Sequence, residues 1–230
     1  MFGTPQINTP VFKKLKSAGI RIVYTDNHRY TFTHAKFWII DDIYSISTGN
    51  WTASFFTKNR EYIYSGTDLA TLSFLEDIFV ADTSHLGYKD LSRIPDHIVI
   101  SPLDARSKIL GLIASTQSHI ILYIQTLNDE EILGSLDILI ASGKTVEICT
   151  ADNESNQVRK LQFSTWKWHL SRKPYIHAKV IIVDRDRVFI GSHNLTTNAL
   201  ENNREIGIIL RDRDDIVSQI ESDFVRDGCR

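Results

Sequence analysis

The chain has 230 residues, of which 42% are apolar and 23% charged, and its formal net charge is −2. This composition is typical of one large globular domain or two fused halves, and it lacks the strongly basic footprint usual in nucleic-acid binders. No stretch reaches the 18 uncharged apolar residues that a membrane-spanning helix needs.

The first part of the chain predicts a short series of helices and strands. A helix is expected near residues 10–18 and another near 69–81. The strands expected between them are "IRIVYT" (20–25), the run containing "HAKFWIID" (34–41), "YSIST" (44–48) and "REYIYS" (60–65).

The later part alternates strands and helices more regularly. Ser101-Pro102 predicts the start of a helix that runs to about residue 117, with Ile109, Leu110 and Ile113 on one face. Asn128 is expected to cap a second helix, which Gly143 ends. Strands are expected over 97–101, 119–126, 145–150, 175–184, 187–192 and 204–210, and further helices over 155–163 and 214–225. This alternation predicts an α/β fold, with a mixed sheet flanked by helices.

The spacing His-x-Lys-x4-Asp occurs twice in the chain. It places His34, Lys36 and Asp41 in one copy, and His177, Lys179 and Asp184 in the other, 143 residues later. "STGNWT" (47–52) then matches "GSHNLT" (191–196), and "KNREYIY" (58–64) matches "NNREIGI" (202–208). The chain therefore contains a duplicated unit, with a boundary expected between residues 1–90 and 91–230. Two copies of one polar set predict a pseudo-twofold site at their junction.

The repeated residue types suit phosphodiester chemistry. Two lysines and two asparagines can hold the non-bridging oxygens and neutralise charge there. A neutral histidine can attack phosphorus, and a second, protonated histidine can donate to the leaving oxygen. Because lysine supplies the cationic charge, we expect neither a metal ion nor another cofactor. Cys149 lies in an apolar run and is expected in the core, whereas Cys229 is expected to be loose, so no disulfide and no Cys-rich metal site is predicted.

The two motifs and the elements that follow them resemble the phospholipase D superfamily over roughly residues 18–210. The resemblance implies two phospholipase D-like halves in a pseudo-twofold arrangement, with the first half shortened at its N-terminal side. It implies that His34 is the nucleophile and His177 the general acid and base, although the pseudo-symmetry permits the reverse. The further catalytic residues it implies are Lys36, Lys179, Glu61 and Glu205. The phosphate-binding residues it implies are Asn50, Asn194, Thr48 and Ser192.

Other roles for some of these residues remain open. Asn50 and Asn194 can serve as turn or helix-cap residues, and Glu61 and Glu205 can pair with the adjacent arginines. Asp41 and Asp184 are expected to be structural, because an odd offset from His places them on the opposite face of a strand.

The resemblance implies a metal-independent phosphodiesterase or phosphatidyltransferase that acts through a phosphohistidine. A phospholipid substrate is our first hypothesis and a nuclease the second. A third reading is an inactive fragment that binds phosphate or membranes. The run "RKLQFSTWKWHLSRK" (159–173) carries five basic residues and two tryptophans, which suit either a nucleic-acid strand or peripheral contact with an anionic membrane.

The first half is shorter than the second before its histidine. We expect that an opening strand, its helix and a further strand have no counterpart there, and that a segment upstream of Met1 is missing. Residues 1–30 should then be the least well packed, and the open sheet edge should favour self-association. No secretory signal is visible in residues 1–10, and no compartment is predicted.

Overall fold

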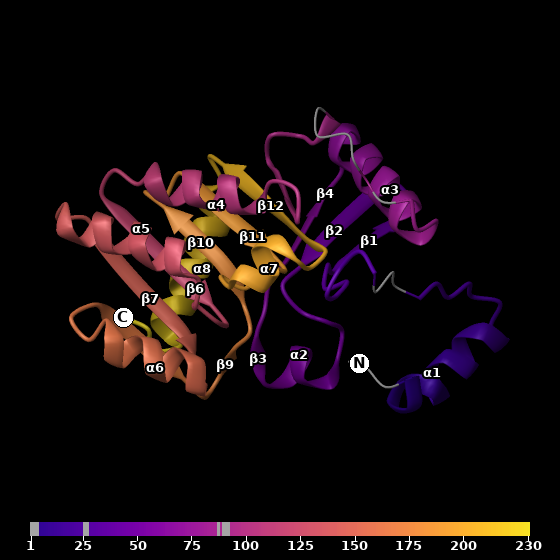
Figure 1. Ribbon diagram of the computed structural model, residues 1–230, viewed down its shortest axis with the longest axis horizontal. Coiled ribbons are helices and arrows are strands. Elements are labelled where there is room, and N and C mark those ends of the chain that lie inside the picture. Colours follow the sequence, from indigo (N-terminus) through magenta and orange to yellow (C-terminus); the bar gives the residue numbers. More distant parts are fainter. Residues whose placement is uncertain (1–4, 25–27, 87, 89–92) are drawn as a thin grey trace.

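The computed structural model describes the chain except residues 1–4, 25–27, 87 and 89–92 (Figure 1). It is a mixed α/β structure, as the alternating pattern predicts. The elements of residues 1–90, the first half, are α1 (Pro5–Ser17), β1 (Phe37–Ile40), β2 (Ile43–Ser47), α2 (Ala53–Thr57), β3 (Asn59–Arg60), β4 (Ile63–Gly66) and α3 (Leu69–Thr83).

Residues 91–230, the second half, contain the larger share of the fold. The strands are β5 (Ile98–Ser101), β6 (His119–Ile124), β7 (Thr145–Ala151), β8 (Lys167–Ser171), β9 (Tyr175–Ile176), β10 (Lys179–Val183), β11 (Arg187–Gly191) and β12 (Glu205–Arg211). The helices are α4 (Ala105–Ala114), α5 (Glu130–Ala141), α6 (Glu154–Gln162), α7 (Thr197–Glu201) and α8 (Asp214–Arg226).

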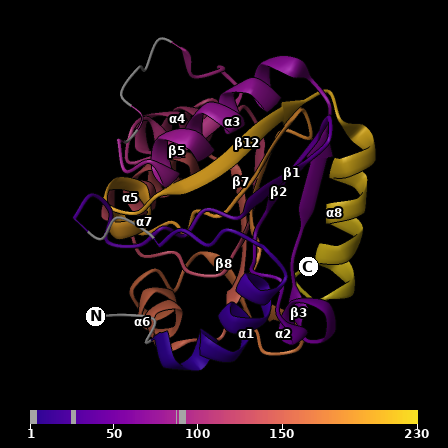
Figure 2. The same cartoon turned by 90° about the vertical axis from the view of Figure 1, so that its right-hand side faces the viewer.

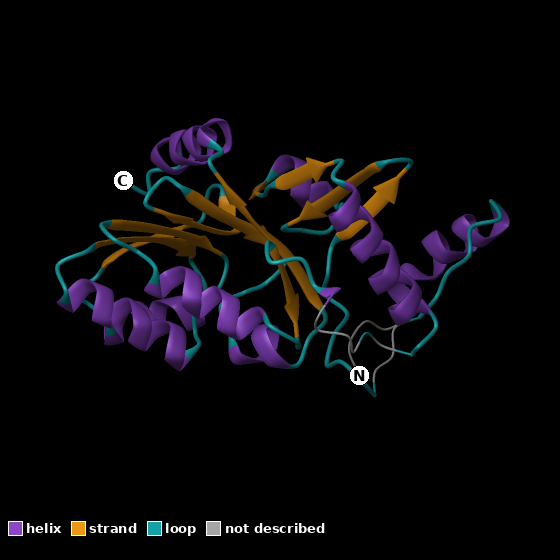
Figure 3. Ribbon diagram, turned by 90° about the horizontal axis from the view of Figure 1, so that it is seen from above, coloured by secondary structure: helices purple, strands orange, loops and turns teal. Residues whose placement is uncertain are grey.

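The large sheet has seven strands in the order β5-β12-β11-β10-β6-β7-β8. Its first four pairings, from β5 to β6, are antiparallel, and β6, β7 and β8 are parallel to one another. Helices cover both of its faces (Figure 2 and Figure 3). Since α4 and α5 pack on one face and α8 on the other, the strand residues between them are almost continuously apolar and buried.

The small sheet has three strands in the order β1-β2-β4. It corresponds to β10, β11 and β12, because its cross-strand pairs fall at equivalent positions: Phe37 lies opposite Ile46 as Val180 lies opposite Ile190. The apolar core that α8 covers continues onto this sheet and α3, and Tyr44 and Leu75 are fully buried in it. In the described residues, no strand pairs with the outer edge of β1, where β10 pairs with β6.

Several boundaries differ from the sequence-based predictions. The strand predicted over 20–25 is wrong for the described residues 20–24, which form no strand. The helix predicted from Ser101-Pro102 begins at Ala105 instead, because the chain makes a turn after β5 before the helix forms. Asp129, rather than Asn128, caps α5 by accepting a hydrogen bond from the Ile132 amide.

The predicted strand "IRIVYT" lacks the neighbour that a strand in its place would need. α1 leads into it through Gly19 at φ +78°, as α5 leads into β7 through Gly143 at φ +81°. β7 is a strand because β6 and β8 pair with it on its two sides. The first half has no counterpart of β6 among its described residues, so residues 20–24 have no strand beside them, and tertiary context overrides their β-propensity.

The described residues that precede the small sheet are loosely packed. None of residues 9–24, 28 and 29 is buried, and Figure 1 shows α1 standing apart from the sheets. Tyr30 is the exception, because its ring lies against the guanidinium of Arg204. This agrees with the expectation of poor packing before residue 30.

The expectation of a loose, unpaired Cys229 is wrong. Cys229 forms a disulfide with Cys149, and the bond ties the C-terminal tail to β7 across a sequence separation of 80 residues. The short sequence around Cys229 gave no sign of this pairing, because only the return of α8 along the sheet brings the tail beside β7. With His169, the two cysteines also form a cluster of groups able to bind a metal, but both sulfurs are committed to the disulfide.

Candidate functional site

The two halves meet through backbone contacts that are equivalent in both directions. β3 pairs in parallel with β9, so that Arg60 lies opposite Ile176, and Arg204 forms the matching bridge to Thr33 (Figure 1). The His177 amide donates to the Arg60 carbonyl at 3.2 Å, and the His34 amide donates to the Arg204 carbonyl at 2.9 Å. Each histidine is therefore held at the start of its strand by the other half of the chain.

The side chains of the two histidines also contact the opposite half of the chain in a reciprocal way. Nδ1 of His177 lies 2.7 Å from Oε1 of Glu61, and Nδ1 of His34 lies 2.8 Å from Oε2 of Glu205. Each imidazole belongs to one half and its carboxylate to the other. A carboxylate on Nδ1 favours the tautomer that carries its proton there, which leaves Nε2 as the free nitrogen. The alternative that each glutamate forms a salt bridge with the adjacent arginine finds no support, because Arg60 pairs with Asp227 and Arg204 pairs with Asp82.

The hydroxyl of Thr48 and the amide of Asn59 hold the Glu61 carboxylate, with hydrogen bonds of 2.7 and 3.1 Å. Asn203 donates to Glu205 at 2.9 Å from the equivalent position. Burial alone would raise the pKa of Glu61, but hydrogen bonds from His177, Thr48 and Asn59 outweigh it and lower this pKa. The site therefore keeps both carboxylates charged.

Both motif lysines are buried beside their histidines. Nζ of Lys179 lies 3.1 Å from Nδ1 of His177, and Nζ of Lys36 donates to the His34 carbonyl. Burial lowers the pKa of Lys36 to about 8 and that of Lys179 to about 7, although Glu61 and Glu205 act in the opposite direction. These mutual effects place the two lysines and the two glutamates in one electrostatic cluster.

The environments of the two histidines are not identical. His177 is 22% exposed and His34 is 32% exposed. Burial lowers the pKa of His177, with Glu61 acting against that change. Gly49 and His193 occupy equivalent positions in the two repeats. A Cβ at Gly49 would lie 2.3 Å from Glu61, whereas the second half carries there the fully buried His193, whose pKa burial lowers to about 4.

The residues predicted to bind phosphate have varied surroundings. Asn50 is exposed and, with Lys36 and Trp51, lines a cleft of about 280 Å³. The side-chain oxygen of Asn194 is buried and has no hydrogen-bond partner among the residues that the structure describes. Thr48 contacts Glu61 as described, and the Ser192 hydroxyl exchanges hydrogen bonds with the backbone of Ile206. Their role toward phosphate stays a prediction.

The third residue of each motif lies away from the histidines. The Asp184 carboxylate accepts the amides of Gln117, Ser118 and His119 and thereby fixes the start of β6, and these bonds lower its pKa to about 2 against the effect of burial. Asp41 is exposed at the matching turn, where the described part of the first half contains no counterpart of β6. Both residues adopt positive φ, 52° for Asp41 and 51° for Asp184, as a turn residue does.

Two pairs of residues in the repeats were not singled out from the sequence. Asn59 and Asn203 stand two residues before each glutamate, and their recurrence at the same offset was the available signal. Arg60 binds Asp227, the C-cap residue of α8, at 2.7 Å, and Arg204 binds Asp82 of α3 at 2.9 Å, so each arginine is paired with a helix or helix end of the other half.

The tryptophans of the basic run do not form an exposed platform. Trp166 and Trp168 are buried, 7% and 8% exposed, and pack in the core beneath α4 and α5. Arg159 and Arg172 pair with Glu130 and Asp152. No helix in the described residues is long and apolar enough to cross a membrane.

Solved structures share this fold. The chain resembles Nuc, a phospholipase D family member from Salmonella typhimurium (22% identity, TM-score 0.53), over 57% of this chain and 91% of Nuc. It resembles phosphatidylserine synthase from Haemophilus influenzae Rd KW20 (17%, 0.62) over 82% of this chain and 60% of the synthase. It also resembles polyphosphate kinase from Porphyromonas gingivalis (15%, 0.69) over 96% of this chain and 39% of the kinase.

The comparison with curated proteins gave no match. The sequence profile of the family described as "Cardiolipin synthase, PLD-like domain" matches residues 109–227, which is just over half of the chain. That span contains the second His-x-Lys-x4-Asp motif with the elements that follow it, and the fold of the solved structures agrees with the match. The chain belongs to the phospholipase D superfamily.

Proposed function

We propose that the chain is a metal-independent phosphodiesterase or phosphatidyltransferase that works through a phosphohistidine intermediate. The observation that carries the proposal is the reciprocal contact of the two histidines with glutamates of the opposite halves. Neither half can build this arrangement alone. Two buried lysines beside it supply the positive charge that a phosphodiester requires.

The contacts support a definite first step. Nε2 of one histidine attacks phosphorus and forms a P–N bond, while the bond from phosphorus to the leaving oxygen breaks. The second histidine, protonated, gives its proton to that oxygen. Its Nδ1 keeps its own proton and donates it in a hydrogen bond to the glutamate, whose negative charge stabilises the cationic ring in both roles.

The second step reverses these roles. The second histidine, now neutral, takes a proton from water or from an acceptor alcohol. The oxygen of that nucleophile attacks phosphorus, the P–N bond breaks, and the first histidine returns to its neutral state. Water gives hydrolysis and an alcohol gives transfer. Lys36 and Lys179 lie where they can stabilise the negative charge on phosphorus in both steps.

The surroundings of the histidines favour His177 as the nucleophile. A nucleophile must be neutral, and burial lowers the pKa of His177 while Lys179 lies 3.1 Å from its Nδ1. The more exposed His34 suits proton exchange with the leaving group and the solvent. This is the reverse of the assignment that the resemblance implies, and trapping the intermediate distinguishes the two.

Phospholipid is the substrate we propose first. The matched family is described as cardiolipin synthase, and one structurally similar protein is a phosphatidylserine synthase. The likeness to Nuc supports the second candidate, a nuclease. The burial of Trp166 and Trp168 removes the stacking platform that most favoured a nucleic acid strand.

The test measures hydrolysis of bis(4-nitrophenyl) phosphate with and without EDTA, followed by assays on phosphatidylglycerol vesicles and on single-stranded DNA. The expected result is EDTA-resistant hydrolysis, inhibition by vanadate or tungstate, and transfer or release on the vesicles. His34→Asn and His177→Asn should each lower the rate by several orders of magnitude.

The matched control is His119→Asn. His119 also pairs with a glutamate, Glu147, at 2.7 Å, but this pair lies outside the site. This variant should retain the parent rate. Acid-quenched mass spectrometry should find the phosphoryl adduct on the peptide that contains His177. Activity that is lost with EDTA and restored by a divalent metal would contradict the mechanism, and inactivity on every phosphodiester would favour the inactive phosphate-binding reading.

A further inference from the structure

Large apolar side chains of the first half are exposed where their counterparts in the second half are buried. Ile40 is 59% exposed, and its counterpart Val183 is fully buried. Trp51 is 60% exposed, and its counterpart Leu195 is fully buried. The same contrast holds for Phe56 and Leu200, and for Phe79 and Phe224. The buried counterparts belong to both cores, Leu195 and Leu200 to the one that α4 and α5 cover and Phe224 to the one that α8 covers, so the described residues of the first half lack cover on both faces of the small sheet.

The second half shows what covers these positions. β6 pairs antiparallel with β10, with Lys179 opposite Ile124 and Val183 opposite Ile120. Tyr123 of β6 packs against Phe224 of α8 with ring centroids 5.3 Å apart. Leu127, just after β6, bridges to Leu195. One strand with its flanking residues therefore accounts for much of the burial that the first half lacks.

The outer edge of β1 presents the backbone groups that such a strand requires. The Ser47 amide donates to the Lys36 carbonyl, so Lys36 and alternate residues after it face β2. The backbone N–H and C=O groups of Ala35, Phe37 and Ile39 consequently point away from β2, toward the open edge. In the second half the equivalent residue Ala178 accepts the Gln125 amide of the β6 segment at 2.9 Å. The open edge of β1 thus presents its backbone donors and acceptors at the same positions as the edge of β10 that pairs with β6.

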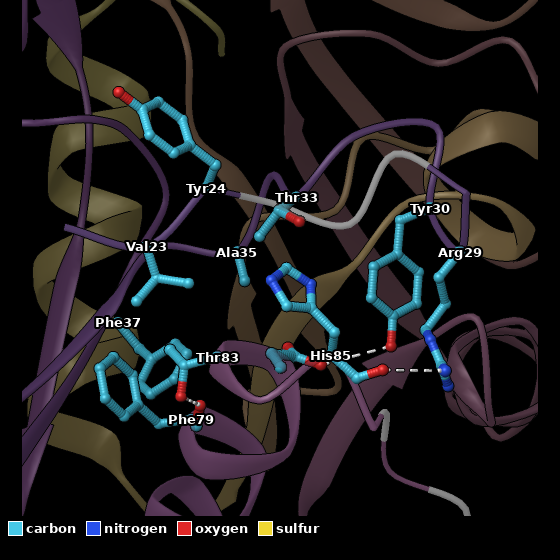
Figure 4. A pocket seen from close by; sticks show the side chains of 11 residues that line it. Val23, Tyr24, Arg29, Tyr30, Thr33, Ala35, Phe37, Phe79, Thr83 and His85 are labelled. Carbon is cyan, nitrogen blue, oxygen red and sulfur yellow. Dashed lines mark hydrogen bonds between the residues drawn. The ribbon is translucent and has the colours of Figure 1, made fainter.

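Hollows lie beside this edge. One pocket of about 200 Å³ is lined by residues that include Val23, Tyr24, Ala35, Phe37 and Phe79 (Figure 4). A second hollow runs along Phe37, Trp38 and Ile39 to α3. Val23 and Tyr24, in the segment that follows α1 as β7 follows α5, line the first hollow together with Phe37 of β1. The place that β6 occupies in the second half is therefore a groove in the first.

We propose that this groove binds an extended apolar segment of another polypeptide, which adds a strand antiparallel to the outer edge of β1. The segment has the chemistry of β6: about six residues, rich in β-branched and apolar side chains, with an aromatic ring that packs on Phe79. Main-chain hydrogen bonds provide the affinity, and the alternating side chains provide the specificity. Because β1 corresponds to β10, the pairing of β6 with β10 indicates both the register of the bound segment and the side chains that it should carry.

The probe is a peptide of residues 118–126, "SHIILYIQT", with a soluble lysine tail, added to the full chain. The expected result is saturable binding with a blue shift of tryptophan fluorescence, because Trp38 and Trp51 lie beside the groove. A peptide of the same composition in scrambled order should not bind at the same concentration. Isotope-edited infrared spectra should show the labelled peptide carbonyls in antiparallel pairing.

N-methylation of the peptide tests the register without altering the protein. Residue 125 of the β6 segment bonds to β10, so residues 121 and 123 face the same way. A methyl on the Tyr123 amide should weaken binding at least about tenfold, since it removes one hydrogen bond and blocks close approach. A methyl on the Leu122 amide, which faces away from β1, should weaken binding less.

Two protein variants complete the test. Phe79→Asp places a charge in the groove and should abolish binding. Leu161→Asp alters an apolar residue that is 79% exposed on α6, far from the groove in the fold, and should leave binding unchanged. Circular dichroism and thermal melts verify that both variants fold.

Three results would overturn the proposal. The first is no binding at millimolar peptide, and the second is equal binding by Phe79→Asp. The third is a concentration-dependent dimer of the chain alone that Ile40→Asp dissociates, which would assign the edge of β1 to a second copy instead. None of these readouts depends on catalytic activity.

Discussion

His177 Nδ1 lies 2.7 Å from Oε1 of Glu61, a carboxylate that the other half of the chain supplies. The exchange is mutual, because His34 takes its carboxylate from Glu205. The two histidines can therefore be oriented correctly only when the halves are docked. Folding of the interface and assembly of the site are one event.

Replacing Glu61 with Gln should lower kcat by about 10² to 10⁴, because the amide holds the imidazole less well and does not stabilise its cation. The fold should survive, since the amide keeps the size of the carboxylate and can still accept from Thr48. Steady-state kinetics and a thermal melt on the same sample separate the two effects.

The double variant Glu61→Gln/His177→Asn should be hardly slower than His177→Asn alone, since both residues act as one unit. If the two losses instead multiply, Glu61 acts elsewhere than on His177.

The activity should fall on the alkaline side of neutrality. Burial lowers the pKa of Lys179 to about 7 and that of Lys36 to about 8, so both lose their positive charge as pH rises through this range. The logarithm of kcat/KM, which reports groups of the free enzyme, should decline between about pH 7 and 9. A profile that stays flat to pH 10 at constant ionic strength would refute the role of these lysines.

Lys179→Met should inactivate the protein but stabilise it. A lysine whose pKa is lower in the folded state than in the unfolded state destabilises the fold when it is charged, because burial disfavours the ammonium form. The unfolded chain then binds more protons between about pH 7 and 10.5, so the free energy of unfolding rises with pH across that window. Methionine should raise this free energy at pH 7 by about 1–4 kcal/mol, as replacement of buried ionic groups by apolar ones can.

The measurement is urea denaturation at pH 7 and pH 9.5. The difference in stability between the two pH values should be smaller in Lys179→Met than in the parent. A variant less stable than the parent at both pH values would mean that the bonds of Lys179 to His177 outweigh the effect of its burial.

Arg204→Met should destabilise the docking of the halves. Arg204 is 1% exposed, donates to the Ser101 carbonyl at 3.0 Å, pairs with Asp82 and lies 4.4 Å from the Tyr30 ring. Its loss leaves the Asp82 carboxylate without the opposite charge of its ion pair, and the expected decrease in unfolding free energy is about 3–5 kcal/mol.

The control is Arg213→Met, which removes an exposed pair with Asp215 and should change stability by less than about 1 kcal/mol. Chemical denaturation of both variants gives the comparison. Equal effects of the two substitutions would show that the Arg204 brace contributes nothing to the contact between the halves.

Local pattern was enough to predict much of this protein. Residues that repeat at one spacing identified the histidines, lysines and glutamates, because a duplicated site needs the same residue types at the same offsets. Apolar runs bounded by turn residues located β5, β6, β7, β11 and β12, since buried strands of a covered sheet are continuously apolar. Gly143 marked the end of α5 for the same local reason: it supplies the positive φ there.

Contacts between distant segments decided the rest. The sequence gives no sign that Glu61 serves His177 rather than His34, because the exchange depends on β3 docking beside β9. It predicted "IRIVYT" as a strand, yet a strand forms only where a neighbour accepts its hydrogen bonds, and the first half has no described counterpart of β6. The disulfide of Cys229 and the braces of Arg60 and Arg204 likewise depend on where α8 and α3 pack, which is a property of the assembled halves and not of either segment.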